Sequence, residues 1–345
     1  MSLPGLKQSF VIGFLQTPVG PVPQVSSSLA WIDRLGSFKV RWGIGRMHYT
    51  VDPGLYALGK PDQQSPVLVT SNFKMSFDRL RETLSGRNVW ILVLDTRGIN
   101  VWCAAGKGTF GTTELVSRIE SSGLAQVVSH RELILPQLSG PGIAAHEVKK
   151  LSGFKVTYGP IRSRDLPNFL DNGHKANPKM RLKTFTTWER IILIPMELVA
   201  ALKVGLIIMA VLFLFSLLGG QGWTNALNHG LFSIIAILTA ISAGAVLTPL
   251  LLPWLPGHAF SLKGASIGLL AAIILLAFRW GNRFEGLGWL ILIPAVSAFL
   301  AMNFTGASTY TSLSGVKKEM RWALPLEIIG AVIGFGLWIG SNFSA

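Results

Sequence analysis

Five long apolar stretches fill most of the second half of this 345-residue chain. They cover residues 198–218, 231–252, 264–280, 287–303 and 323–340. Each is close to the ~20 residues that a helix needs to cross a hydrocarbon core about 30 Å thick, although the third and fourth are short. A chain with this pattern must place much of its length in a membrane. We predict an all-α transmembrane domain of five helices over residues 197–345.

The first part of the chain has a different composition. Residues 1–190 hold 24 of the 31 Lys and Arg and 13 of the 17 Asp and Glu, a net charge of +11, whereas the remaining residues carry only +3. Such a break indicates a soluble part followed by a membrane part. We expect residues 1–35 to form an N-terminal lead, 36–172 an α/β domain and 173–196 a basic juxtamembrane linker.

Basic residues cluster at the predicted membrane border, namely His174, Lys175, Lys179, Arg181, Lys183 and Arg190. The positive-inside tendency and the membrane lipid explain this cluster without a nucleic-acid partner. Lys317, Lys318 and Arg321 agree with the same orientation, whereas Arg279 and Arg283 disagree. Residues 1–20 lack the pattern of a signal peptide. We therefore expect a multi-pass protein of the cytoplasmic membrane whose soluble domain lies in the cytoplasm.

Short apolar segments alternate with amphipathic ones before this border. The segments typical of strands are 67–70, 89–94, 126–129 and 154–158, and those typical of helices are 73–84, 112–121, 143–151 and 164–170. This alternation predicts a doubly wound parallel α/β sheet, Rossmann-like or flavodoxin-like, with ligands at the carboxyl ends of the strands. The region 36–59 is less clear and is compatible with a small β element.

The chain has one cysteine, Cys103. It therefore has no internal disulfide, no cysteine-based zinc site and no cysteine-ligated iron–sulphur cluster of its own. His130, His146 and His174 lack a matching set of metal ligands and are expected to be ordinary surface histidines. A free cysteine is most often a buried, inert residue, so its presence alone does not establish chemistry.

The segment that contains Cys103 can be interpreted in two ways. Gly106, Gly108 and Gly111 fit the pattern G-x-G-x-x-G of a dinucleotide site, with Glu132 as the ribose-binding acid. This interpretation requires residues 99–105 to be a strand. Alternatively, residues 100–107 form a short helix under a large flat ligand, with Asn100 as its N-cap. Cys103 would then lie near the positive end of the helix, which favours the metal-binding thiolate.

The eight residues 100–107, N-V-W-C-A-A-G-K, resemble the cap-helix motif N-(V/I)-W-C-A-(A/S)-G-K of the HgcA family of mercury-methylating corrinoid proteins. All eight positions match. The domain around them also resembles the corrinoid domain of the corrinoid iron–sulphur protein of acetyl-CoA synthesis, in segments such as 69–73 and 158–160. Five spans after a corrinoid domain are also similar to the HgcA arrangement.

The resemblance implies a corrinoid cofactor with Cys103 as the lower axial ligand of cobalt. It also implies contacts from the other cap-helix residues, namely Asn100, Val101, Trp102, Ala104, Ala105, Gly106 and Lys107. Further contacts are expected at the end of the first predicted strand, from Thr70, Ser71, Asn72 and Ser76, because ligands bind at that edge of such sheets. Capping of the next helix by Ser71 or Asn72 is the alternative role.

The implied activity is that of a corrinoid-dependent methyltransferase that passes a methyl group to Hg(II) and forms methylmercury. Since the chain has no cluster of its own, the family implies a reducing partner, the ferredoxin HgcB with two four-iron clusters. An upstream methyl-donor protein or methyl-tetrahydrofolate system would supply the methyl group. Two alternatives remain, a general membrane-bound methyl carrier of one-carbon metabolism and a non-catalytic, membrane-tethered nucleotide sensor.

The transmembrane half is interpreted as an anchor and docking platform. Ionisable residues inside spans usually mark a transport path. Only Glu197, Lys203 and Glu327 qualify, and all three lie near the predicted ends of spans. The glycines of residues 330–336 predict close helix packing.

Overall fold

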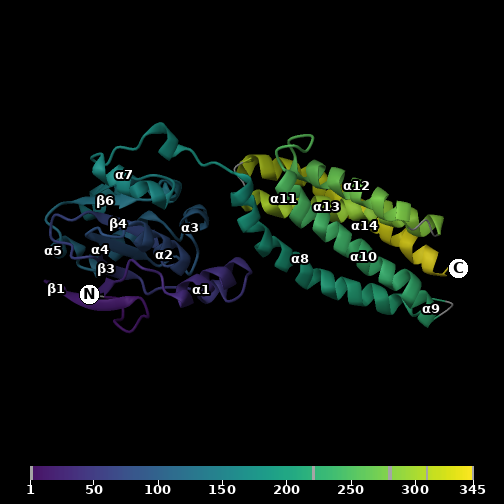
Figure 1. Cartoon of the computed structure of the whole chain (residues 1–345). Coiled ribbons are helices and arrows are strands. Elements are labelled where there is room, and N and C mark those ends of the chain that lie inside the picture. Colours follow the sequence, from purple (N-terminus) through teal and green to yellow (C-terminus); the bar gives the residue numbers. More distant parts are fainter. Residues whose placement is uncertain (1–2, 220–221, 279–281, 308–309, 344–345) are drawn as a thin grey trace. The chain divides into compact units, whose positions relative to one another are not determined.

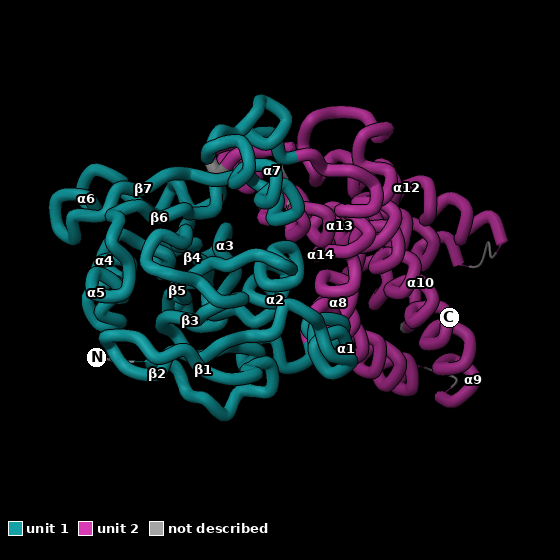
Figure 2. The backbone as a smooth tube through the Cα atoms, turned by 60° about the vertical axis from the view of Figure 1, so that its left-hand side comes forward, with its two compact units in different colours: residues 1–40, 44–183 teal, residues 41–43, 184–345 magenta. Residues whose placement is uncertain are grey.

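The computed structural model describes residues 3–219, 222–278, 282–307 and 310–343. The chain divides into two compact units, shown in different colours in Figure 2. The first comprises residues 1–40 and 44–183, and the second residues 41–43 and 184–345. The first is built on a mixed sheet and the second is helical, with five long apolar helices. The predicted order, an α/β domain followed by five apolar helices, is confirmed.

Seven strands form the sheet, in the order β1-β2-β3-β5-β4-β6-β7. Their bounds are β1 Val11–Thr17, β2 Gly20–Val25, β3 Gly54–Leu58, β4 Val67–Ser71, β5 Val89–Leu94, β6 Glu132–Leu135 and β7 Lys155–Tyr158. Strands β5, β4, β6 and β7 are parallel, as predicted. Strand β3 is antiparallel to β5. The connection 59–66 from β3 to β4 is too short for the crossover that parallel strands need, so the chain reverses direction there.

The first 35 residues differ from the expected lead. Strands β1 and β2 pair as an antiparallel hairpin, and the end of β2 pairs in parallel with β3. Helix α1, Trp31–Arg41, then crosses the predicted domain boundary at residue 36. Strand β2 was not predicted because it contains Pro21 and Pro23, and proline is confined largely to edge strands and strand starts.

Apart from α1, the helices of the first unit follow the predicted pattern with one exception, α5. They are α2 Lys74–Thr83, α3 Val101–Lys107, α4 Thr112–Ser121, α5 Leu124–Val127, α6 Ala145–Ser152 and α7 Leu166–Asp171. The predicted strand 126–129 is wrong, because this segment begins in α5 and the strand is β6. Leu124 and Val127, three residues apart, are both buried in the core. This helical spacing outweighs the preference of Val127 and Val128 for strands.

Two apolar cores lie on opposite faces of the sheet. Val67, Val69, Leu92 and Leu94 pack with residues of α3, α4, α5 and α6. Leu68, Ile91 and Val93 pack with residues of α2 and α7. Because successive strand residues point to opposite faces, β4 and β5 contribute to both cores, and helices cover both faces as a doubly wound domain requires.

In the second unit, five helices are long and apolar enough to cross a membrane, and Figure 1 shows them side by side. They are α8 Thr187–Ser216, the composite helix Trp223–Leu251, α12 Phe260–Phe278, α13 Arg283–Asn303 with its extension to Gly306, and α14 Leu313–Phe343. The composite helix contains α9 Trp223–Asn225, α10 Leu231–Ile241 and α11 Thr248–Leu251, joined by two π-helical segments, η5 Ala226–Gly230 and η6 Ser242–Leu247. The predicted end of the third span at residue 280, and Arg279, lie outside the described residues.

Small residues bring these helices together. A Cβ atom on Gly334 of α14 would lie 2.9 Å from the backbone oxygen of Gly288 in α13. One on Gly264 of α12 would lie 2.6 Å from the backbone oxygen of Ser297 in α13. These backbones approach closely only because the side chains are absent, which is how apolar helices associate in a membrane. The close packing predicted for the glycine-rich segment 330–336 is therefore present at Gly334.

Candidate functional site at the carboxyl edge of the sheet

The segment 100–107 is a helix, α3, with Asn100 as its N-cap, as the second interpretation of the sequence predicted. The side-chain Oδ1 of Asn100 accepts a hydrogen bond of 3.0 Å from the backbone N–H of Cys103. Gly108 ends the helix in the left-handed conformation, with φ of 80°. The local sequence therefore sets both ends of the helix.

One face of α3 packs on the sheet and the other is open. Ala104 and Ala105 are buried in the core, with Ile99 and Val101 packed beside them. Cys103 is exposed, so the buried, inert cysteine considered above is not what the fold produces. Trp102 is 36% exposed, and a Cβ atom added to Gly106 would meet no atom within 4 Å. Trp102, Cys103, Gly106 and Lys107 thus form an accessible surface, which we call the α3 outer face.

Asn72 fixes the turn that leads into α3. It lies directly after β4 and is 6% exposed. Its Oδ1 accepts hydrogen bonds from the backbone N–H groups of Thr96 (3.1 Å) and Gly98 (3.0 Å), and Thr96 Oγ1 lies 2.9 Å away. Its Nδ2 donates to Asp95 Oδ1 at 3.2 Å. Both the oxygen and the nitrogen of the Asn72 side chain are thus bonded within the protein, which makes Asn72 a positioning residue for α3.

The other residues predicted at this edge are placed differently. Thr70 and Ser71 are buried in β4, and Ser76 is half-buried in the first turn of α2. Neither Ser71 nor Asn72 caps α2, whose N-cap is Phe73 without a side-chain hydrogen bond. The Oγ of Ser71 is buried and has no hydrogen-bond partner among the residues that the structure describes. Buried hydroxyl groups normally make a hydrogen bond, so the Ser71 hydroxyl is a candidate contact for a ligand at this edge.

Arg46 is a neighbour of Cys103 that sequence reasoning missed. It belongs to a short 3₁₀ helix, η1 Arg46–His48, and its guanidinium lies 5.0 Å from the centre of the Phe73 ring. Burial lowers the pKa of Arg46, while the charge of a Cys103 thiolate acts in the opposite direction. Arg46 is thus a positive charge within electrostatic reach of the sulphur. No motif marks it, since it lies in the region 36–59 that the sequence left unclear.

Gly98 and Gly142 allow the surrounding backbone to approach α3 and its leading turn. Gly98 has φ of 70°, and a Cβ there would lie 3.0 Å from the backbone oxygen of Met47. A Cβ on Gly142 would lie 3.0 Å from the Cα of Ala105. Gly142 lies in the loop between β6 and α6, and Gly98 lies in the turn after β5, so loops from two strand ends pack around the helix that carries Cys103.

The dinucleotide interpretation does not fit this geometry. It required a strand over residues 99–105, where the structure has α3. Gly106 lies inside that helix, Gly108 ends it and Gly111 precedes α4. Glu132 is the first residue of β6 and lies at the opposite edge of the sheet from α3, 3.7 Å from Lys155. The three glycines therefore do not form a phosphate-binding turn between a strand and a helix.

Two histidines of the first unit contact residues of their own surroundings. His130 Nε2 lies 3.0 Å from the backbone oxygen of Ser65, and the His174 ring stacks on Phe169. Within the described ranges, no group of three or more His, Cys, Asp or Glu side chains could hold a metal ion.

Comparison with known proteins shows what the segment around this site is similar to. Residues 45–170 match the family model described as CO dehydrogenase/acetyl-CoA synthase delta subunit. The chain is also similar to three archaeal proteins named acetyl-CoA decarbonylase/synthase complex subunit gamma. The one from Methanopyrus kandleri is 36% identical over 124 residues, 35% of this chain and 26% of that protein. Those from Methanocaldococcus jannaschii and Methanothermobacter thermautotrophicus are 34% and 32% identical, over 37% and 36% of this chain.

The chain spans only about a quarter of the length of these relatives, 26% to 28%. The match includes β4, β5, α3 and the loop that contains Gly142, and it leaves out the five apolar helices. The part of the first unit that carries Cys103 is therefore similar to the CO dehydrogenase/acetyl-CoA synthase delta subunit family and, more distantly, to the gamma subunits of acetyl-CoA decarbonylase/synthase.

Proposed function

We propose that this protein is a corrinoid-dependent methyltransferase that transfers a methyl group to Hg(II) and forms methylmercury. The observation that carries the proposal is Cys103, exposed on a short helix at the carboxyl edge of the sheet, in a segment similar to the CO dehydrogenase/acetyl-CoA synthase delta subunit family. The mercury acceptor rests on the eight-residue motif 100–107 and on the five apolar helices that follow the domain.

The residues present fit a corrinoid on the α3 outer face. Cys103 offers a soft sulphur ligand, and the open space above Gly106 allows a broad ring to approach the backbone. Trp102 provides an apolar surface beside the sulphur. Ser71, buried and without a partner in the described residues, offers a hydroxyl at the same edge. A bound corrinoid would supply a cobalt centre that can carry a methyl group, whereas the protein sets ligand, orientation and access.

The chain's own residues would control the sulphur. Hg(II) is an electrophile, so the methyl group must reach it together with its bonding electrons. An anionic sulphur donor favours this polarity, as a thiolate does in cysteine-ligated haem proteins. Arg46 brings a positive charge within electrostatic reach of this sulphur. Asn100 and Asn72 hold the helix that presents it.

The proposed protein partners supply the electrons and the methyl group. With one cysteine it has no ligands for an iron–sulphur cluster of its own, so a ferredoxin of the HgcB type, with two four-iron clusters, is the proposed reductant. A methyl-donor protein or methyl-tetrahydrofolate system would supply the methyl group upstream. The five apolar helices would anchor the protein in the cytoplasmic membrane, with the first unit in the cytoplasm.

A general membrane-bound methyl carrier is the second candidate. It is favoured by the relatives, whose names refer to acetyl-CoA decarbonylase/synthase and not to mercury. Both candidates require the same Cys103 site and differ in the acceptor of the methyl group. The two can therefore be separated by offering the methylated holoprotein Hg(II) and an acetyl-CoA-forming partner in parallel reactions.

The direct test is Cys103→Ala in the full chain, loaded with corrinoid and supplied with a methyl donor and a reduced ferredoxin. We expect methylmercury formation to fall to background. Corrinoid binding should largely persist, because the ring would still contact the remaining surface of α3. Absorbance should report loss of the sulphur ligand. Lys150→Gln, at an exposed lysine of α6 outside the α3 outer face, serves as the control and should keep activity. Near-normal methylmercury production by Cys103→Ala would refute the role of the thiolate.

A further inference from the structure

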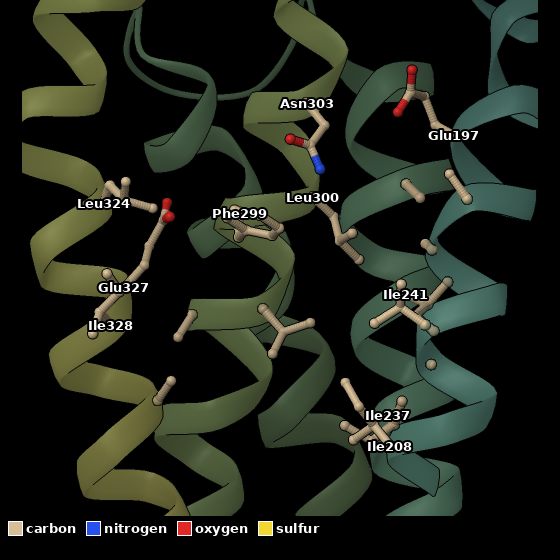
Figure 3. A pocket seen from close by; sticks show the side chains of 18 residues that line it. Glu197, Ile208, Ile237, Ile241, Phe299, Leu300, Asn303, Leu324, Glu327 and Ile328 are labelled. Carbon is tan, nitrogen blue, oxygen red and sulfur yellow. The ribbon is translucent and has the colours of Figure 1, made fainter.

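A cavity of about 650 Å³ lies among the apolar helices of the second unit (Figure 3). Helices α8, α10, α13 and α14 and the segment η6 contribute its walls. The lining side chains are apolar except for Glu197, Asn303 and Glu327. This volume is within the range of sites that bind small organic molecules.

Glu327 is the unusual member of this lining. The residue is 8% exposed, and neither carboxyl oxygen has a hydrogen-bond partner in the described part of the chain. Figure 3 shows the carboxyl group directed from α14 toward Phe299. Glu319, also on α14 and also buried, is different, since its carboxylate accepts a hydrogen bond of 2.6 Å from the Ser261 backbone N–H. Burial of a carboxyl group without a hydrogen-bond partner is unfavourable in free energy. Glu327 is therefore a candidate group for binding a ligand.

The polar groups of the cavity are gathered toward one end. In Figure 3, Glu197 and Asn303 lie near one end, and Ile208 and Ile237 lie at the other. The described residues that line the cavity include two carboxyl groups and no lysine, arginine or histidine. A molecule that satisfies this arrangement has a hydrocarbon body for the apolar end and a head that carries positive charge.

We propose that this cavity binds a lipid-soluble amine, with its ammonium group paired to Glu327 and its hydrocarbon chain directed toward Ile208 and Ile237. An ammonium group donates three hydrogen bonds, which suits a carboxylate whose two oxygens are both free of partners in the described structure. An anionic head would be repelled by both Glu197 and Glu327. A neutral alcohol would satisfy one oxygen and would leave the charge uncompensated in a medium of low dielectric constant. This site is independent of the Cys103 chemistry.

The test compares three probes of equal chain length, dodecylamine, dodecanol and dodecanoate, on the full chain in a nonionic detergent. Equilibrium dialysis with radiolabelled probes measures affinity and stoichiometry. We expect one dodecylamine per chain, bound about tenfold or more tighter than dodecanol, with dodecanoate weakest. Glu327→Gln keeps the shape of the side chain but removes its charge. It should lower the affinity for dodecylamine about tenfold to a hundredfold and leave that for dodecanol nearly unchanged.

Two neighbouring residues of α14 provide a matched pair of controls. Ala331 lines the cavity, whereas Val332 does not and is 67% exposed. Ala331→Leu should fill part of the cavity and weaken binding of both the amine and the alcohol. Val332→Leu should change neither. This pair separates binding in the cavity from partition of the probes into detergent.

A measurement on the unaltered protein makes the test independent of how the variants fold. Dicyclohexylcarbodiimide modifies protonated carboxyl groups in apolar surroundings, and mass spectrometry locates the modified residue. Dodecylamine should protect Glu327 from this reagent, and dodecanol should not. Equal protection by both probes, or equal binding of all three to the protein and to Glu327→Gln, would overturn the proposal and identify the cavity as a nonselective lipid groove.

Discussion

A buried charged cluster in the first unit and a buried carboxyl group in the second unit are satisfied in opposite ways. In the first unit, Asp33, Lys74, Asp78 and Arg81 are all under 9% exposed and form a closed cluster. Lys74 Nζ lies 2.5 Å from Asp33 and 2.7 Å from Asp78, and Arg81 lies 2.7 Å and 2.8 Å from the same two carboxylates. In the second unit, Glu327 is equally buried, yet both its oxygens lack partners among the described residues.

The difference distinguishes charged groups that support the fold from a charged group that can bind a ligand. Burial acts to raise the pKa of Asp33, but the hydrogen bonds and charges of Lys74 and Arg81 outweigh it, so that this pKa lies below its ordinary value. The cluster is thus complete without any added molecule, and it joins α1 to α2. Glu327 has no such compensation. A charge that the fold itself satisfies indicates structure, whereas one that it leaves unsatisfied points to something that binds.

The most direct test of this comparison is to separate the two units. We expect residues 1–183, without the apolar helices, to fold as a soluble domain, because the sheet and both of its cores lie within this range. The fragment should still bind corrinoid under reducing conditions. Circular dichroism and the absorbance of bound corrinoid check the two parts. A well-folded fragment that never takes up corrinoid would show that the second unit contributes to the site.

Removal of one cation from the cluster should have the next largest effect. Arg81→Met in residues 1–183 leaves Asp33 and Asp78 with one cation between them. We expect the free energy of unfolding to fall by about 3–5 kcal/mol, as measured by urea titration. Arg79→Met on the same helix is the control, since Arg79 pairs with Glu82 at the surface and should contribute at most about 1 kcal/mol. Similar losses for the two variants would contradict the importance of burial.

Asn72→Ala should have an intermediate effect. It removes the acceptor of the backbone N–H groups of Thr96 and Gly98 and leaves these donors unpaired in a buried turn. We expect a loss of roughly 2–4 kcal/mol in urea titration and weaker corrinoid binding, because the turn leads into α3. Asn100→Ala, which removes only the cap of α3, should cost about 1 kcal/mol. Unchanged corrinoid affinity in Asn72→Ala would show that α3 keeps its position without this contact.

Glu327→Leu should have the smallest effect on stability. Replacement of an unpaired buried carboxyl by an apolar side chain is expected to leave the thermal midpoint of the full chain unchanged or slightly higher. Glu285→Leu is the contrast, since Glu285 is buried 3.0 Å from His229 and its removal leaves the histidine without this partner. A marked loss of stability in Glu327→Leu would mean that the carboxyl supports the fold of the helices.

The sequence predicted those parts of the structure that local signals determine. Strand β5 and helix α4 have the predicted bounds, and Asn100 caps α3 because an asparagine side chain can bond the backbone three residues on. The β1–β2 hairpin was not predicted because Pro21 and Pro23 argue against a strand. Its pairing also depends on residues outside each strand. The same holds for Arg46 and for the role of Asn72, whose neighbours come from distant segments. The cavity beside Glu327 depends on how four of the long helices pack, which no single helix reveals.

The exposure of Cys103 has a practical consequence for anyone who handles this protein. Because the chain carries one thiol and the fold leaves it accessible, a maleimide dye or spin label should attach at a single known position without mutagenesis. The same feature makes the protein a one-equivalent target for thiol-seeking metals. Free Hg(II) supplied in excess would bind the sulphur itself, so mercury in an assay needs to be buffered by competing thiols.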